Sequence, residues 1–296
     1  MSRPWFLIAL FTVTACADDG APPSTAWVSN KDGGTILACP YAGAVDWAAC
    51  SPLDLPGLAN PIKLVFLGGT AWISSFGDAG ATTNTIFDCR AGNGTISDCR
   101  PANFTGYDFP VNLAVRDGRL VVPSYDNGRV LAYEPGSADP VASLAVDSPS
   151  DVFFVSDDDA LVVSQSDGDA NRILACAVDG VALSDCVTAL DLGSEVALSI
   201  GENAGWIYLT LPGANRVRKC ARSGRELVDC EDVGDAALFD YPYGITFRDG
   251  AVYVPNRQPG VDSIVICRVA ADGDLGDCRL ETAGGRLDGP TWVVFR

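Results

Sequence analysis

The fold is decided by a short repeated pattern, and Arg172-Ile173-Leu174-Ala175-Cys176 followed by Ser184-Asp185-Cys186 is one clear copy of it. An apolar stretch ends at a cysteine, a glycine turn follows, and a second stretch returns to another cysteine, which is typical of a β-hairpin. Ten of the eleven cysteines fall into five such pairs. The pairs are Cys39/Cys50, Cys89/Cys99, Cys176/Cys186, Cys220/Cys230 and Cys267/Cys278.

One further copy of the pattern lacks cysteines and fills the double-length gap in the middle of the chain. It places Tyr133 and Leu144 where the other copies have their two cysteines. The six units are then 43 to 50 residues apart. This period is the one that four-stranded propeller blades use, so the sequence predicts an all-β, six-bladed β-propeller with four-stranded blades.

The two ends of the repeat array indicate how the ring closes. Residues 26–29 match the second strand of a blade, whereas residues 290–295 match a first strand. We therefore expect the C-terminal strand to complete the N-terminal blade, with residues 26–296 forming one closed domain.

The cysteine-free copy also predicts how the cysteines pair. Since Tyr133 and Leu144 replace both cysteines of one hairpin together, each remaining cysteine is expected to bond within its own hairpin. Closing loops of this size contributes about 2 to 3 kcal/mol per disulfide. Five disulfides favour an oxidising compartment. An aspartate precedes the second cysteine in four copies, where we expect it to blunt the exposed edge of the blade.

Composition excludes several classes of function. The chain has no histidine, which removes Ser-His-Asp and Cys-His nucleophiles and the usual zinc and copper sites. The formal net charge is −18, so nucleic acid is not an expected partner. The negative charge favours binding of metal ions or cationic partners over that of nucleic acid. The alternative is that the acidic residues only keep an exported protein soluble.

The N-terminus has the pattern of an export signal. Arg3 is followed by an apolar run at residues 5–13, too short to span a bilayer, and then by Val13-Thr14-Ala15-Cys16. This tetrad resembles the lipobox of bacterial lipoproteins, in which the residue matching Cys16 receives the lipid. The resemblance implies a signal peptide at 1–15 and a lipid anchor at Cys16, the one unpaired cysteine. The alternative is ordinary secretory cleavage with a free Cys16.

The anchor would be followed by a flexible tether at residues 16–25, which show no apolar periodicity. The resemblance therefore places the protein in the bacterial cell envelope, at the outer membrane or cell surface. The membrane is the expected partner through Cys16, and the domain itself is expected to be a monomer.

The hairpins, together with an asparagine before the third strand at Asn84, Asn171 and Asn215, resemble six-bladed propellers built from NHL-type repeats. They are more distantly similar to the gluconolactonase and SMP-30 group. In that group a divalent ion sits at the mouth of the central channel on oxygen ligands, one from each contributing blade. The resemblance is one of repeat pattern and implies the fold rather than an activity.

Aligning the six first strands predicts one equivalent channel-mouth position in each blade. The six residues are Lys63, Asn112, Asp151, Glu195, Gly244 and Trp292. By this resemblance Asn112, Asp151 and Glu195 are candidate ligands for Ca²⁺ or another hard divalent cation, which prefers oxygen ligands. Lys63 and Gly244 depart from the family, because they stand where further oxygen ligands would be needed. The alternative is a hydrogen-bonded ring around a water-filled channel.

Three functions remain open at this stage. The first is an envelope-anchored lipoprotein whose propeller acts as a binding module for an unidentified protein or small molecule, because no catalytic constellation is recognisable. The second is a divalent-metal-dependent hydrolase acting on lactones or related esters. The third is a structural part of the envelope without a soluble ligand.

Overall fold

The computed structural model describes residues 25–77, 84–92, 94–166, 170–258, 260 and 262–296. Cys16, the signal peptide 1–15 and residues 16–24 of the tether lie outside the described residues, so the predicted lipidation stays a prediction. The described chain forms six four-stranded antiparallel sheets, which confirms the all-β, six-bladed propeller.

Each blade is named by its strands, from the innermost to the outermost. Blade 1 contains β24 (Pro290–Phe295), β1 (Thr25–Asn30), β2 (Thr35–Pro40) and β3 (Ser51–Leu53). Blade 2 contains β4 (Pro61–Leu67), β5 (Thr70–Ser75), β6 (Thr85–Gly92) and β7 (Thr95–Pro101). Blade 3 contains β8 (Ala114–Arg116), β9 (Arg119–Ser124), β10 (Arg129–Tyr133) and β11 (Ala142–Ala145).

The second half of the ring repeats this order. Blade 4 contains β12 (Pro149–Phe154), β13 (Asp159–Ser164), β14 (Asn171–Asp179) and β15 (Ala182–Gly193). Blade 5 contains β16 (Ser199–Asn203), β17 (Trp206–Leu211), β18 (Arg216–Ser223) and β19 (Glu226–Val233). Blade 6 contains β20 (Thr246–Arg248), β21 (Ala251–Asn256), β22 (Ser263–Val269) and β23 (Leu275–Glu281).

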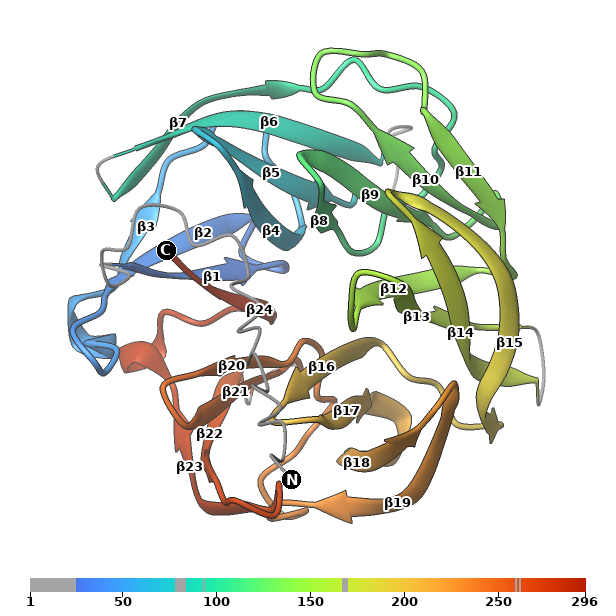
Figure 1. Cartoon of the computed structure of the whole chain (residues 1–296). Helices are drawn as coiled ribbons and strands as arrows, with labels where there is room; N and C mark the ends of the chain where they lie inside the picture. Colours follow the sequence, from blue (N-terminus) through green and yellow to red (C-terminus); the bar gives the residue numbers. More distant parts are fainter. Residues whose placement is uncertain (1–24, 78–83, 93, 167–169, 259, 261) are drawn as a thin grey trace, which may run out of the picture.

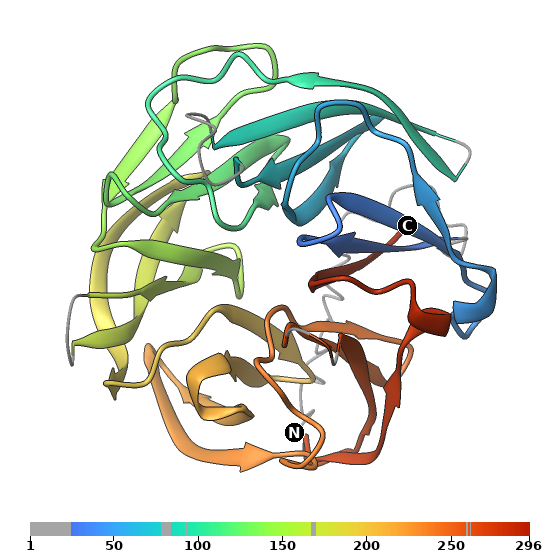
Figure 2. The same ribbon diagram turned by 180° about the vertical axis from the view of Figure 1, so that it is seen from behind.

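The blades are arranged around a central axis, with β4, β8, β12, β16, β20 and β24 facing it (Figures 1 and 2). The ring closes as expected, because β24 pairs with β1 and Val28 lies opposite Val293. The first and last strands of the described chain therefore share one sheet, and no seam is left between the ends of the ring.

The core lies between neighbouring blades rather than at the axis. Between blades 4 and 5, for example, Leu161 and Ile173 pack with Ile207 and Leu209, and all four side chains are buried. Burying a side chain of this kind contributes about 1.5 to 3 kcal/mol. Because every blade buries a face against both neighbours, the ring is stabilised as one unit.

All five predicted disulfides are formed, each within its own hairpin, with Cα–Cα separations of 4.0 to 4.1 Å. This confirms the pairing that the cysteine-free copy predicted. The bonds are Cys39–Cys50, Cys89–Cys99, Cys176–Cys186, Cys220–Cys230 and Cys267–Cys278.

The two cysteines of a pair differ in burial, which the sequence pattern did not predict. The first cysteine of every hairpin is buried between blades, and so is Cys50 in blade 1. The second cysteine of the other four hairpins lies on the outermost strand and is only half-buried: Cys99, Cys186, Cys230 and Cys278. Each of these four disulfides therefore fastens the partly exposed outer strand of a blade to a buried strand.

In the same four hairpins the aspartate before the second cysteine has a positive φ, between 45° and 52°: Asp98, Asp185, Asp229 and Asp277. The strand register shifts at the same place, which is a β-bulge. Aspartate tolerates the left-handed conformation better than most residues. The recurring aspartate therefore also allows the β-bulge, a backbone role that was not predicted beside its expected role at the exposed edge of the blade.

Blade 3 replaces the disulfide with an aromatic stack. The Tyr133 ring lies 4.4 Å from that of Phe104, which in turn lies 5.2 Å from that of Trp72 in blade 2. The buried Tyr133 hydroxyl donates to the carbonyl of Thr105 at 2.6 Å. The residue that takes the place of a cysteine thus ties its strand to the neighbouring blade through packing.

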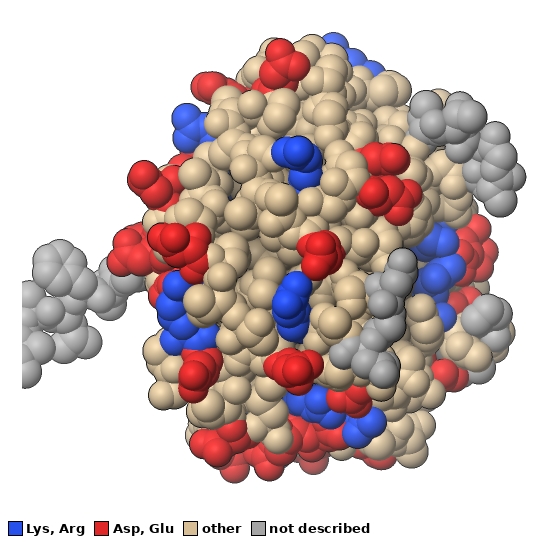
Figure 3. Space-filling view, turned by 90° about the vertical axis from the view of Figure 1, so that its right-hand side faces the viewer, with Lys and Arg blue, Asp and Glu red and all other residues tan. Residues whose placement is uncertain are grey.

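The outer surface reflects the acidic composition. Seen from the side of β11 and β15, it carries scattered Asp and Glu side chains among fewer Lys and Arg (Figure 3). Within the part of the chain that the structure describes, we find no helix with the length and apolar character needed to cross a membrane.

Candidate ligand site at the channel mouth

The strand register defines which residues share the channel-mouth position. Lys63 lies opposite Ser74, Ser199 opposite Thr210, and Trp292 opposite Ser29, always against the equivalent residue of the second strand. The residues at this position are Lys63, Asn112, Asp151, Ser199, Gly244 and Trp292, and we call them the inner ring. Five of these six residues are the ones that the sequence alignment placed in equivalent positions, and Ser199 replaces Glu195.

Glu195 is not a member of the inner ring, and the alignment that put it there is wrong. It precedes β16, and its carboxylate binds Arg218 at 2.6 Å and Arg216 at 3.0 Å, away from Asn112 and Asp151. Asp232 joins the same ion-pair network. The alignment slipped because blade 5 lacks the proline that precedes the first strand in the other five blades, so no residue marked where β16 begins.

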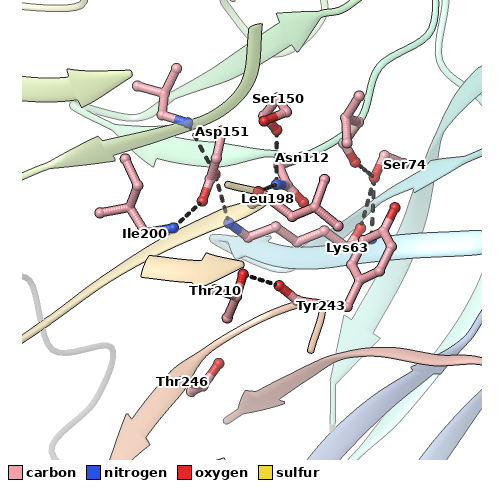
Figure 4. Close-up of polar contacts among 12 residues, drawn as sticks. Lys63, Ser74, Asn112, Ser150, Asp151, Leu198, Ile200, Thr210, Tyr243 and Thr246 are labelled. Atoms are coloured by element: carbon pink, nitrogen blue, oxygen red, sulfur yellow. Dashed lines mark hydrogen bonds and ion pairs between the residues drawn. The ribbon is translucent and has the colours of Figure 1, made fainter. Parts of the chain in front are cut away.

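Lys63 reaches from blade 2 towards blade 4. Its ammonium nitrogen lies 3.5 Å from Oδ1 of Asp151 (Figure 4). The same nitrogen lies 3.8 Å from the centre of the Trp292 ring in blade 1. The side chain is only 12% exposed. A cation over an indole face is stabilised by the ring quadrupole. One side chain therefore links the inner strands of three blades.

Asp151 is held mainly by backbone donors. Its Oδ2 accepts from the amide of Ile200 in blade 5 at 2.9 Å, and its Oδ1 accepts from the amide of Val152 at 3.0 Å (Figure 4). The side chain is 1% exposed. Both oxygens are thus already hydrogen-bonded within the protein, and Lys63 adds a longer charged contact to Oδ1.

Burial works against the charges of this pair. Burial lowers the pKa of Lys63, and the neighbouring Asp151 carboxylate opposes that change. Burial likewise raises the pKa of Asp151, with Lys63 and the two backbone amides opposing it. Desolvation disfavours the charged form of any group that is removed from water. Burial therefore disfavours the charged form of both groups, and their mutual attraction only partly offsets this desolvation.

Asn112 completes this side of the inner ring. Its Nδ2 donates to the carbonyls of Ser150 at 2.8 Å and Leu198 at 3.2 Å, which joins blades 3, 4 and 5 (Figure 4). The Oδ1 of Asn112 and the hydroxyls of Ser150 and Ser199 are buried and have no hydrogen-bond partner among the described residues. Buried polar atoms of this kind are costly, and they concentrate at the same part of the inner ring as the buried ion pair.

Gly244 is required by the indole on the other side of the inner ring. A Cβ at this position would lie 2.6 Å from the Thr291 carbonyl and 2.7 Å from the Trp292 ring. The amide of Gly244 also donates to the Thr291 carbonyl at 3.0 Å. The absence of a side chain at Gly244 therefore lets Trp292 occupy the position from which it contacts Lys63.

Hydroxyl groups fasten the inner strands to one another around the ring. Thr210 donates to the carbonyl of Tyr243 at 2.6 Å, Thr291 to that of Ile62 at 2.7 Å, and Ser74 to that of Val111 at 2.9 Å. These bonds join neighbouring blades. These hydroxyls are not the residues of the predicted hydrogen-bonded ring, which consisted of Lys63, Asn112, Asp151 and Glu195.

The geometry does not gather three oxygen ligands for a metal. Asn112 and Asp151 come together, but Glu195 lies elsewhere and the Lys63 ammonium is the cation beside Asp151. Among the described residues, no three His, Cys, Asp or Glu side chains are grouped to hold an ion. Hard cations usually take six to eight oxygens, so the predicted calcium site would need ligands that these residues do not supply.

Ser199, Thr210 and Thr291 are the inner residues that sequence reasoning missed. Only a correct register for blade 5 would have revealed Ser199 and its partner Thr210. The fold and this ring define the class: a six-bladed β-propeller whose first strands hold a buried Lys–Asp pair.

No family model matches the chain, and no curated protein resembles it in sequence. The predicted NHL-like or SMP-30-like membership therefore stays a prediction. Solved structures do resemble it. A chain of a nidogen/laminin complex has a TM-score of 0.71 at 9% identity and covers 92% of this chain and 97% of its own. A protein from Bacteroides uniformis named "putative 6-phosphogluconolactonase" has a TM-score of 0.64 at 14% identity, covering 92% and 99%.

A third similar structure is the WD40 propeller of Doa1, with a TM-score of 0.56 at 12% identity, covering 86% of this chain and 78% of its own. Identities this low establish the fold alone. The three proteins have unrelated names, so the function has to be argued from the inner ring.

Proposed function

We propose that the protein is an exported binding module that holds a small ligand at the inner ring through Lys63. One observation carries the proposal. An ammonium group has three N–H donors, yet among the described residues the only acceptor that Lys63 meets is Asp151, at 3.5 Å. That distance is at the outer limit of a hydrogen bond, while the side chain is largely removed from water.

The ligand is expected to offer a hydroxyl or carbonyl oxygen to Lys63. A free cation is disfavoured, because Lys63 already supplies the positive charge beside Asp151. A neutral, oxygen-rich molecule is favoured over a strong anion, because the Asp151 carboxylate lies 3.5 Å from the same ammonium. The five disulfides support export, and a lipid at Cys16 would hold this module at the cell envelope.

The test is a thermal-shift and calorimetric screen of the oxidised protein with glucose, sorbitol and lactamide as neutral oxygen-rich probes. The test variant is Lys63→Met with Asp151→Asn, because removing both charges avoids leaving a bare buried carboxylate. The control is Glu195→Gln, which lies outside the inner ring. Binding by the wild type and by the control, and its loss in the double variant, is the expected result. If the double variant binds as well as the wild type, or no probe binds at millimolar concentration, the proposal fails.

The hydrolase remains a second candidate, because Asn112 and Asp151 are adjacent at the inner ring and the similar structure from Bacteroides uniformis is named "putative 6-phosphogluconolactonase". Native mass spectrometry with and without a chelator tests it. Loss of a bound divalent ion in Asp151→Asn but not in Glu195→Gln would support a metal centre at the inner ring. A metal-free mass for the wild type after incubation with Ca²⁺ would remove this candidate.

A further inference from the structure

The hairpin of blade 1 differs from its counterparts in the region between its cysteines. Cys39 and Cys50 are 11 residues apart, which is close to the spacing of 10 in three other pairs. In those three hairpins, strands continue beyond the disulfide. Here the chain instead forms an isolated bridge between Tyr41 and Val45 and a single 3₁₀ turn, η1 (Trp47–Ala49). The turn is capped by Asp46, whose carboxylate accepts from the amide of Ala49 at 3.2 Å.

The segment between Cys39 and Cys50 packs against blade 6. The Tyr41 hydroxyl donates to the carboxylate of Asp249, and the Trp47 ring lies 6.5 Å from that of Tyr253. In Figures 1 and 2 the loop that follows β2 lies beside the short red helical turn η3 (Ala283–Gly285), which follows blade 6. The chain of blade 1 thus forms one wall of a space whose other wall is blade 6.

The space between these walls is a cleft of about 540 Å³. Its inner surface is apolar and includes Val45, Trp47, Ala251, Tyr253 and Ile266. Pockets for small molecules usually measure about 300 to 1,000 Å³ and combine apolar walls with a few placed polar groups. By contrast, a cavity beside Val121 and Leu183 is about 20 Å³ and has room for little more than one water molecule.

Three hydrogen-bond donors in the cleft have no acceptor among the described residues. They are the indole nitrogen of Trp47, the hydroxyl of Tyr253 and the guanidinium of Arg279. Trp47 and Tyr253 are 8% and 5% exposed, and the small exposed part of each side chain includes its donor atom. The two polar atoms therefore reach solvent at the cleft, where a ligand can accept from them.

The remaining charges of the cleft are neutralised in pairs. Arg268 binds Asp277 at 2.6 Å, and Asp249 is bound by Arg248 at 3.4 Å and by Tyr41. The four charged lining residues sum to zero, but Arg279 makes no ion pair with a described residue, so its guanidinium is open to an anionic ligand. Burial raises the pKa of Tyr253 and the Arg279 guanidinium opposes that rise, which places the charge within electrostatic reach of the phenol.

From these contacts we infer that the cleft between blades 1 and 6 is a second binding site, which takes a small carboxylate with an aromatic or branched apolar body. The carboxylate accepts from Arg279 and from the Tyr253 hydroxyl, and the body lies against Trp47 and Val45. Arg–carboxylate hydrogen bonds are the strong, charge-assisted kind. The site is separate from the inner ring and does not depend on the function proposed there.

The probes are phenylacetate and its neutral counterpart phenylacetamide, which share the same ring and differ in charge. Isothermal calorimetry on the full oxidised chain is expected to show phenylacetate binding at least about tenfold more tightly, the equivalent of 1.4 kcal/mol. Arg279→Met is expected to remove that preference, and Tyr253→Phe to weaken phenylacetate by several-fold. Arg279 is on the surface, so its substitution is expected to leave the melting temperature unchanged.

The matched control is Arg268→Met, which removes a rim guanidinium that is already paired with Asp277 and is expected to leave binding intact. The Lys63→Met/Asp151→Asn variant is also expected to bind phenylacetate normally, which separates this site from the inner ring. Equal affinity for acid and amide, full binding by Arg279→Met, or the lack of any binding at millimolar phenylacetate would each overturn the inference.

Discussion

Lys63 and Lys219 are both buried lysines over a tryptophan ring, and they are held in opposite ways. Lys219 lies 4.6 Å from the centre of the Trp206 ring and reaches Asp274 at 2.7 Å, Glu231 at 2.8 Å and the carbonyl of Asp272 at 3.1 Å. Its three N–H donors therefore have three acceptors. Lys63 has one distant acceptor, Asp151. Of the two lysines, only Lys219 has a complete set of acceptors: Glu231 lies in its own blade 5, and Asp272 and Asp274 lie across the junction in blade 6.

The partners of the two lysines differ in exposure as well as in number. The carboxylates of Glu231 and Asp274 are 61% and 60% exposed, whereas that of Asp151 is 1% exposed. An exposed carboxylate that loses its cation is hydrated again, but a buried one is not. The comparison teaches that the burial of the partner, rather than the number of bonds, decides how costly it is to remove the lysine.

The largest expected effect is that of Lys63→Met on stability. It leaves the Asp151 carboxylate buried without a cation, which costs about 3 kcal/mol, near the lower end for a broken buried pair because two backbone amides still bind the carboxylate. Equilibrium denaturation at neutral pH measures this loss. Adding Asp151→Asn is expected to restore most of the stability, since the pair is then replaced by neutral groups of similar size. If the double variant is no more stable than Lys63→Met, the stranded carboxylate is not the cause.

The loss in Lys63→Met should also depend on pH. Burial already raises the pKa of Asp151 above 3.8, and removing Lys63 takes away the opposing charge, so the pKa rises further. Between 3.8 and the raised pKa, the folded state holds a proton that the unfolded state has released. The free energy of unfolding therefore falls as the pH rises through that window.

Chemical denaturation of Lys63→Met at about pH 5 and about pH 7 is accordingly expected to show the higher stability at the lower pH, relative to wild type at the same two values. The double variant with Asp151→Asn serves as the control, because it has no carboxyl group left to titrate at this position. A cost that is the same at both values would show that Asp151 does not take up a proton when Lys63 is removed.

Lys219→Met is expected to cost less, about 1 to 2 kcal/mol, although it removes more hydrogen bonds. Glu231 and Asp274 regain water, and the methionine side chain still covers Trp206. The loss should show little change between the same two pH values, because neither carboxylate is stranded. A cost above that of Lys63→Met would reverse the comparison and show that the bonds outweigh partner burial.

The six-bladed propeller could be predicted from the sequence, because the spacing of the cysteines and the period of the blades repeat along the chain and can be read without knowledge of tertiary contacts. Tyr133 and Leu144 even showed which copy had lost its disulfide. The aspartates before the second cysteines were assigned a role at the blade edge, but their left-handed φ was not predicted, because a residue type alone does not specify the backbone conformation. The spacing also treated the two cysteines of a pair alike, since burial depends on which strand faces the neighbouring blade.

The inner ring could be aligned in the five blades whose first strand is marked by a proline. Blade 5 has no such proline, and there the alignment chose Glu195 instead of Ser199. The register gives the position of Lys63, but its long side chain reaches Asp151 in blade 4 as well as Trp292 in the neighbouring blade 1, and such a reach does not follow from strand register. The cleft beside Trp47 was not foreseen at all. It depends on a loop that has nearly the same length as its counterparts but a different path.

The smallest expected effect is a difference between the pKa values of Lys63 and Lys219. It tests the comparison of the two lysines in the folded wild-type protein. The sequence contains three lysines, Lys31, Lys63 and Lys219, so their side-chain NMR signals can be followed individually. Burial lowers the pKa of Lys63 below 10.5, with Asp151 only partly opposing it. Burial also acts on Lys219, but hydrogen bonds to Asp274 and Glu231 outweigh it and raise the pKa above 10.5. The Lys63 signal should therefore titrate first and that of Lys219 later, with assignments from Lys31→Met and the Lys63→Met/Asp151→Asn variant. The reverse order would mean that Lys63 is the better-satisfied cation, and the argument for a ligand at the inner ring would lose its basis.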